Sequence, residues 1–135
     1  MAFWPVNGYT TRVSMSRTRR PSLNNPRDIR IVFITAPTRA HALRIARALV
    51  SQRLAACVNC VSGIRSIFRW QGRVDTCAET LLIAKTTARR LPSLTAAVRR
   101  LHPYELPEIL ALPAVGGSPA YLRWVAQSCS FQAQK

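Results

Sequence analysis

A chain of 135 residues, of which 48% are hydrophobic, is long enough for one domain whose core needs no disulfides. It carries 20 Lys+Arg against 5 Asp+Glu, a formal net charge of +15, and nearly all of the cations are arginines. No apolar run approaches the roughly 20 residues that span a bilayer, so we expect no membrane partner. Nucleic acid is not the favoured partner either, because the arginines are scattered rather than interleaved with stacking aromatic residues.

The first 28 residues read as a basic, disordered N-terminal tail. They contain three prolines, few aliphatic residues and the cluster Arg17, Arg19 and Arg20, without a sustained hydrophobic period. An organelle transit peptide and an over-long start, with Met15 as the true initiator, are the alternatives. We predict a cytoplasmic protein whose four cysteines are free thiols, with organelle import through the tail left open.

The domain opens with a strand and a helix. Ile29–Ala36 is β-branched and mostly apolar, which is typical of a buried strand, and Pro37 ends it. Thr38 is a suitable N-cap for a helix that runs to about Arg53. Its apolar residues at helical spacing predict the buried face: Leu43, Ala46, Leu49 and Val50.

Two long strand-like runs follow, at about 56–70 and 73–86, and Gln71-Gly72 between them signals a hairpin. Each arm has roughly 14 residues, whereas a typical strand has about 5–6. Such a hairpin exposes edge groups that favour pairing with a neighbouring subunit. We therefore predict an oligomer built by intersubunit strand pairing, with Trp70 at the hairpin tip as a packing anchor.

The remaining elements complete an α+β, ferredoxin-like βαββαβ order with an added C-terminal helix. Right-handed crossovers place both main helices on one face of the sheet. The domain is predicted to span residues 29–128, followed by a C-terminal tail at 129–135. A second helix is predicted at about 88–101, capped by Thr87, with a buried face made of Leu91, Leu94, Val98 and Leu101. A strand follows at 108–114. The last predicted helix covers 119–128, is capped by Ser118, and turns Tyr121, Leu122 and Val125 inward.

Five segments of the domain, in this order and spacing, resemble the CutA family. They are Ala55-Ala56-Cys57-Val58-Asn59, the run from Gly63 to Gly72, Leu82-Ile83-Ala84-Lys85-Thr86, the run His102-Pro103-Tyr104-Glu105-Leu106-Pro107-Glu108-Ile109, and Tyr121-Leu122-Arg123-Trp124-Val125. The resemblance covers nearly the whole domain. It implies a ferredoxin-like fold, a homotrimer with strands paired between subunits, and a role in tolerance to divalent cations, chiefly copper.

Cys57 matches the family position proposed for copper, and thiolate sulfur suits Cu(I). The alternative is an inert, buried cysteine. Cys57 and Cys60 form a C-x-x-C pair, but residues i and i+3 of a strand point to opposite faces and cannot chelate one metal. The sequence also departs from the family, because Thr38-Arg39-Ala40-His41 stands where acidic residues are common.

The loop after the second helix is the densest polar cluster. Pro103 and Pro107 stiffen it, and it carries His102, Tyr104 and Glu105. His102 and Glu105 are the further metal-ligand candidates. A capping histidine and an arginine-paired glutamate are the alternative interpretation.

Three residues are candidates for lining a ligand cleft: Lys85, Tyr104 and Trp70. Lys85 follows an apolar run near the end of a strand, where it faces a pocket or extends its charge to solvent.

We find no phosphate-binding glycine loop, nucleophile elbow or H-E-x-x-H helix, so no enzyme is predicted. The predicted function is a homotrimeric, non-enzymatic copper-binding and divalent-cation tolerance protein. Copper or another divalent cation, not tightly bound, is the expected ligand. Two alternatives remain: a trimeric signalling module that binds a small anionic ligand between subunits, and a structural scaffold.

Overall fold

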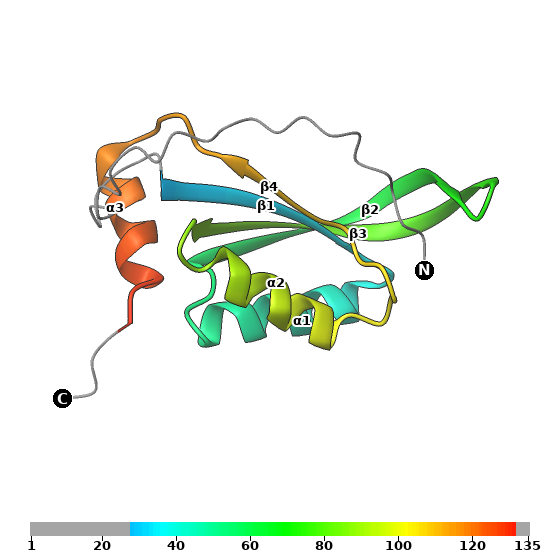
Figure 1. Ribbon diagram of the computed structural model, residues 1–135, viewed down its shortest axis with the longest axis horizontal. Coiled ribbons are helices and arrows are strands. Elements are labelled where there is room, and N and C mark those ends of the chain that lie inside the picture. Colours follow the sequence, from blue (N-terminus) through cyan, green and yellow to red (C-terminus); the bar gives the residue numbers. More distant parts are fainter. Residues whose placement is uncertain (1–27, 132–135) are drawn as a thin grey trace, which may run out of the picture.

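The computed structural model describes residues 28–131 (Figure 1). The predicted N-terminal tail therefore lies outside the described residues except for Asp28, and so does the end of the predicted C-terminal tail. The elements are β1 (Ile29–Ala36), α1 (Arg39–Ser51), β2 (Cys57–Trp70), β3 (Arg73–Thr87), α2 (Leu91–Leu101), β4 (Ile109–Pro113) and α3 (Pro119–Ser128).

The four strands form one antiparallel sheet in the order β2-β3-β1-β4. Helices α1 and α2 lie together against one face, as predicted from the handedness of the crossovers (Figure 1). This is the predicted α+β, ferredoxin-like arrangement. Helix α3 lies at one end of the sheet (Figure 1), where its Leu122 and Val125 pack with Ile29 of β1.

The main core fills the space between the sheet and α1 and α2. Alternate residues of β1 and β3 enter it, because a strand sends successive side chains to opposite faces. Burying these aliphatic side chains supplies about 1.5–3 kcal/mol for each large one. The largest fully buried aliphatic side chains of this core are Val32, Ile34, Ile45, Leu49, Leu82, Leu94 and Val98.

The opposite face of the sheet, which we call the open face, keeps large apolar side chains in contact with solvent. Val61 on β2 and Leu110 and Leu112 on β4 are 43%, 58% and 43% exposed. In register with them, Phe33 pairs with Leu110 and with Ile83 of β3. The described residues therefore leave large apolar side chains of this sheet face uncovered, apart from the end that α3 occupies.

The long hairpin forms as predicted and turns at Gln71-Gly72, where both residues have positive φ (49° and 78°). One irregularity was not predicted. The register shifts between Val61 and Ile64, and Gly63 has φ 80°, so β2 carries one extra residue there. On the inner side of this irregularity Cys60 pairs with Leu82, and on the outer side Ser66 pairs with Cys77.

The predicted C-terminal end of α1 and the predicted N-terminal end of α2 were wrong by a few residues. Helix α1 ends at Ser51 rather than Arg53, because Arg53 takes φ 57° and the next amide returns to Leu49. Helix α2 begins at Leu91 rather than near Ala88. The Thr87 hydroxyl accepts the amide hydrogen of Arg90 in a turn that precedes the helix.

The buried faces of α1 and α3 also differ from the prediction. In α1 the buried residues are Ala42, Ile45, Ala46 and Leu49, whereas Val50 is 43% exposed. In α3, Leu122 and Val125 are buried as predicted, but Tyr121 is not. Within residues 28–131, no helix is both long and apolar enough to cross a membrane.

Candidate functional site

The β2–β3 register places Cys57 directly opposite Lys85 on the open face. The Lys85 ammonium lies 3.9 Å from the Cys57 sulfur and donates a hydrogen bond to the Asn59 side-chain carbonyl. Asn59 is on the same face because it is two residues from Cys57 on β2. Cys57, Asn59 and Lys85 therefore form one polar cluster, which we call the Cys57 cluster.

Helix α3 borders the Cys57 cluster. Burial raises the pKa of the Tyr121 phenol above its ordinary value, and the negative charge of a Cys57 thiolate adds to this rise. The Tyr121 ring in turn lies 5.6 Å from the Trp124 ring, and both side chains are partly exposed. The thiol of Cys57, the ammonium of Lys85, the amide of Asn59 and the phenol of Tyr121 therefore lie near one another at the open face.

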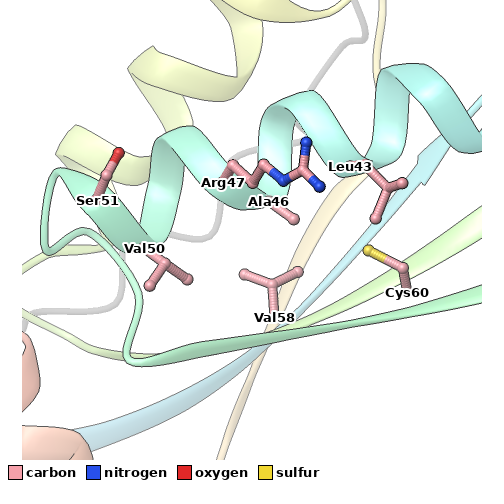
Figure 2. A pocket seen from close by; sticks show the side chains of 7 residues that line it. All are labelled: Leu43, Ala46, Arg47, Val50, Ser51, Val58 and Cys60. Atoms are coloured by element: carbon pink, nitrogen blue, oxygen red, sulfur yellow. The ribbon is translucent and has the colours of Figure 1, made fainter.

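The second cysteine of the C-x-x-C pair faces the other way, as predicted. Figure 2 shows Cys60 and Val58 pointing from β2 towards α1, where Leu43 and Val50 complete an apolar hollow. Its volume is about 580 Å³. Burial raises the pKa of the Cys60 thiol, and the charge of Arg39 opposes this rise. Cys57 and Cys60 therefore do not share a ligand, and all four thiols are free.

His102 is buried at the end of α2 and both of its ring nitrogens have partners. Its Nε2–H donates to the Thr35 carbonyl at 2.7 Å, and its Nδ1 accepts the Tyr104 amide hydrogen at 3.1 Å. The Thr35 carbonyl lies just past Ile34, where the β1–β4 pairing has ended. The ring thus ties β1, just past the end of its pairing with β4, to the start of the loop.

The loop and the hairpin enclose a groove of about 980 Å³, which we call the acidic groove. Tyr104, Glu105 and Trp70, all predicted cleft or metal candidates, line it. So do three further acids and a thiol that the sequence did not single out, Asp75, Glu79, Glu108 and Cys77. The Tyr104 hydroxyl donates to Glu79 Oε2 at 3.4 Å.

Burial and neighbouring negative charge raise the pKa values of two groups in the acidic groove. Burial raises the pKa of the Glu108 carboxyl, and the charge of Glu79 adds to the rise. Burial also raises the pKa of the Tyr104 phenol, with a further contribution from Glu79. Glu79 therefore influences both groups.

The predicted site residues therefore fall into two groups within one subunit. Lys85 lies with Cys57, whereas Tyr104, Glu105 and Trp70 line the acidic groove and His102 lies at the start of the loop that borders it. Glu79 precedes Lys85 by six residues on β3, which is about 20 Å along the strand. Among residues 28–131, no group of three or more His, Cys, Asp or Glu side chains is arranged to hold a metal ion.

Comparison with known proteins places the chain in a family. A family model described as CutA1 divalent ion tolerance protein matches residues 30–128. The Thermus thermophilus divalent-cation tolerance protein CutA is 50% identical over 98 residues, which make up 73% of this chain and 95% of that protein. Mouse protein CutA is 45% identical over 102 residues, or 76% of this chain. The chain spans 58% of the mouse protein and 63% of the chloroplastic rice protein CutA 1.

Solved structures give the same relationship. The Cut A1 divalent cation tolerance protein of Thermus thermophilus superposes with a TM-score of 0.75 at 48% identity, and covers 76% of this chain and 99% of its own. CutA1 from Oryza sativa gives a TM-score of 0.75 at 42% identity, with 78% and 96% coverage. The five segments that carried the resemblance all lie within the matched range. The chain therefore belongs to the CutA1 divalent ion tolerance protein family.

Proposed function

We propose that this protein contributes to divalent-cation tolerance without catalysis, by binding copper or another divalent cation weakly through Cys57. The observation that carries the proposal is the place of this thiol in a CutA1 family member: Cys57 is half-buried on the open face, whereas Cys60 faces the core side. A thiolate is a soft ligand that suits Cu(I), and copper binding releases the thiol proton.

One thiol does not make a metal site, so the proposal includes a homotrimer in which a neighbouring subunit completes the coordination. The exposed apolar side chains of the open face and the long hairpin support strand pairing between subunits. Trp70, 43% exposed beside the hairpin turn, is the proposed packing anchor.

His102 and Glu105 are the weaker ligands of the proposal. To bind a metal, His102 has to give up its hydrogen bond to Thr35 or the one from Tyr104. Glu105 is exposed in the loop and needs no such rearrangement. Neither contacts Cys57 in the same subunit, so a shared site requires a second subunit.

The Lys85 ammonium favours a second candidate function. A positive charge 3.9 Å from the Cys57 sulfur repels a cation and attracts an anion. A small anionic ligand, bound in a cleft between subunits, would make the protein a regulatory module. Such binding survives chelators and weakens steeply with salt.

The test is a copper titration of the full chain under reducing and non-reducing conditions, with Cys57→Ser beside Cys60→Ser as the matched control. Saturable, stoichiometric binding that Cys57→Ser abolishes and Cys60→Ser retains supports the proposal. Binding that ignores Cys57→Ser refutes the ligand assignment. Native mass spectrometry of the same samples tests the trimer.

We also propose a cytoplasmic location, which the four free thiols support because reducing compartments preserve thiols. Fractionation of cells that produce the full chain tests it. Recovery in an organelle, with the N-terminal segment removed, would instead identify that segment as a transit peptide.

A further inference from the structure

The helices of the fold carry positive charge only. The helix layer, as we call it, consists of α1, α2 and the residues that flank them, 37–56 and 88–102. It contains eight arginines and no aspartate or glutamate. Four of the five acids of the chain line the acidic groove, and the fifth, Asp28, is the first described residue. The fold therefore separates the two signs of charge, although the arginines look scattered along the sequence.

Two of the eight arginines hold the end of α3. Arg90 is 6% exposed, and its Nε–H donates to the Cys129 carbonyl at 2.7 Å. Arg53 donates from Nη1 to the Ser128 carbonyl at 3.3 Å. The side chains of the other six are exposed: Arg39, Arg44, Arg47, Arg89, Arg99 and Arg100. Because the layer has no acid of its own, a negatively charged partner would relieve their mutual repulsion.

The helical repeat turns Arg44 and Arg47 away from the sheet. The buried residues of α1 mark the side that faces the sheet: Ala42, Ile45, Ala46 and Leu49. At about 100° per residue, Arg44 and Arg47 lie on the opposite side, and residues three apart are neighbours on a helix surface. Arg47 also borders the apolar hollow of Figure 2.

The end of α2 brings two more arginines beside the start of α1. Arg99 and Arg100 follow the buried Val98 and are exposed. His102, just beyond them, bonds the Thr35 carbonyl, and α1 begins four residues after Thr35. Since α1 and α2 contact each other against one face of the sheet (Figure 1), these arginines belong to one cationic surface.

The composition of this surface favours a rigid polyanion. Neither helix contains an aromatic residue, so the bases of a single strand would find no rings to stack on. Val50 is the one large apolar side chain that α1 and α2 expose, so an apolar membrane anchor is also missing from these helices. A duplex needs neither, because its phosphates lie on the outside and the arginine fork binds phosphate oxygens. We propose that the helix layer binds the phosphate backbone of double-stranded nucleic acid, independently of its sequence.

This binding surface is separate from the Cys57 cluster, and the proposal does not depend on metal binding. The strand pairing proposed between subunits involves the open face and the hairpin, so a homotrimer would present one helix layer per subunit. Several layers on one assembly raise the avidity for a long duplex.

The experiment measures binding of the full chain to a fluorescent, mixed-sequence DNA duplex of about 20 base pairs, by anisotropy over a range of salt concentrations. R44Q/R47Q/R99Q removes three charges from the layer, and R44K/R47K/R99K keeps them. R17Q/R19Q/R20Q is the matched control, because it removes the same charge outside the layer. The three layer positions are exposed, so these variants should fold, and circular dichroism and size-exclusion chromatography check this. Single-stranded DNA of the same length and phosphatidylcholine vesicles with roughly one quarter phosphatidylserine are the competing probes.

Each phosphate contact contributes about −0.9 to the slope of log affinity against log salt concentration. We expect the layer glutamine variant to reduce the magnitude of this slope by about 2–3 and to weaken binding at least about tenfold at low salt, whereas the lysine variant keeps the slope. The control variant should change the affinity less than about threefold. An equal loss in the control would mean that binding follows net charge alone, and would overturn the proposal. So would the absence of salt-dependent binding, or tighter binding to the single strand or to the vesicles than to the duplex.

Discussion

Replacing His102 by alanine separates a structural histidine from a metal ligand. The imidazole is 7% exposed and makes two hydrogen bonds, to the Thr35 carbonyl and from the Tyr104 amide. Each such bond is worth about 0.5–1.5 kcal/mol, and a buried backbone group left without a partner costs about 1–3 kcal/mol. We therefore expect His102→Ala to lower the free energy of unfolding by about 2–4 kcal/mol.

The assay is urea unfolding, at one fixed protomer concentration because oligomerisation shifts apparent stability. His41→Ala is the control, since the His41 ring hydrogen-bonds the exposed Thr38 hydroxyl and its loss should cost less than about 1 kcal/mol. Copper stoichiometry is measured on the same samples. If His102→Ala unfolds like the unmodified protein but loses copper, the structural assignment of His102 is refuted and it becomes a ligand.

Three further changes test other parts of the fold. Thr86→Val keeps the side-chain volume but strands the buried Leu54 carbonyl, which the hydroxyl contacts at 2.6 Å, so we expect a loss of about 1–3 kcal/mol in urea unfolding. Gly72→Ala meets no atom within 4 Å but forces φ 78° on a residue with a Cβ, which should cost about 1–2 kcal/mol, whereas Gly116→Ala should cost little. Glu108→Gln should raise the melting temperature at pH 7, because folding raises the pKa of the Glu108 carboxyl and so disfavours its ionised form. The resulting loss of folding free energy is absent below the pKa of the unfolded state and complete above that of the folded state. Equal effects of Glu108→Gln at pH 3.5 and pH 7 would contradict this reasoning.

The sequence was a good guide to the elements, because their signals are local. The β-branched run at 29–36 and the hairpin turn at 71–72 depend on near neighbours, and both lie where they were predicted. The faces of the helices were harder to predict. Leu43 and Val50 have the right spacing for a core, but they line an open hollow between α1 and the edge strand β2.

The candidate site was only partly predictable for the same reason. Cys57 and Lys85 were singled out separately, and only the β2–β3 register shows that they face each other. Asn59, Tyr121 and Glu79 were missed because nothing in their local sequence marks them. Their importance comes from strand pairing, from α3 packing beside the Cys57 cluster, and from the groove that the hairpin and the loop line together.

The extra residue of β2 between Val61 and Ile64 changes which residues of this strand lie on the open face. Before it, odd-numbered residues such as Cys57 share the open face, and after it, even-numbered residues such as Ser66 and Trp70 do. The extra residue therefore costs β2 one unpaired position without changing the faces that the outer arm shares with β3. Deleting Gly63 would restore a regular ladder in which Ile64 still pairs with Glu79, so both halves of β2, and the Cys57 cluster with them, would keep their faces.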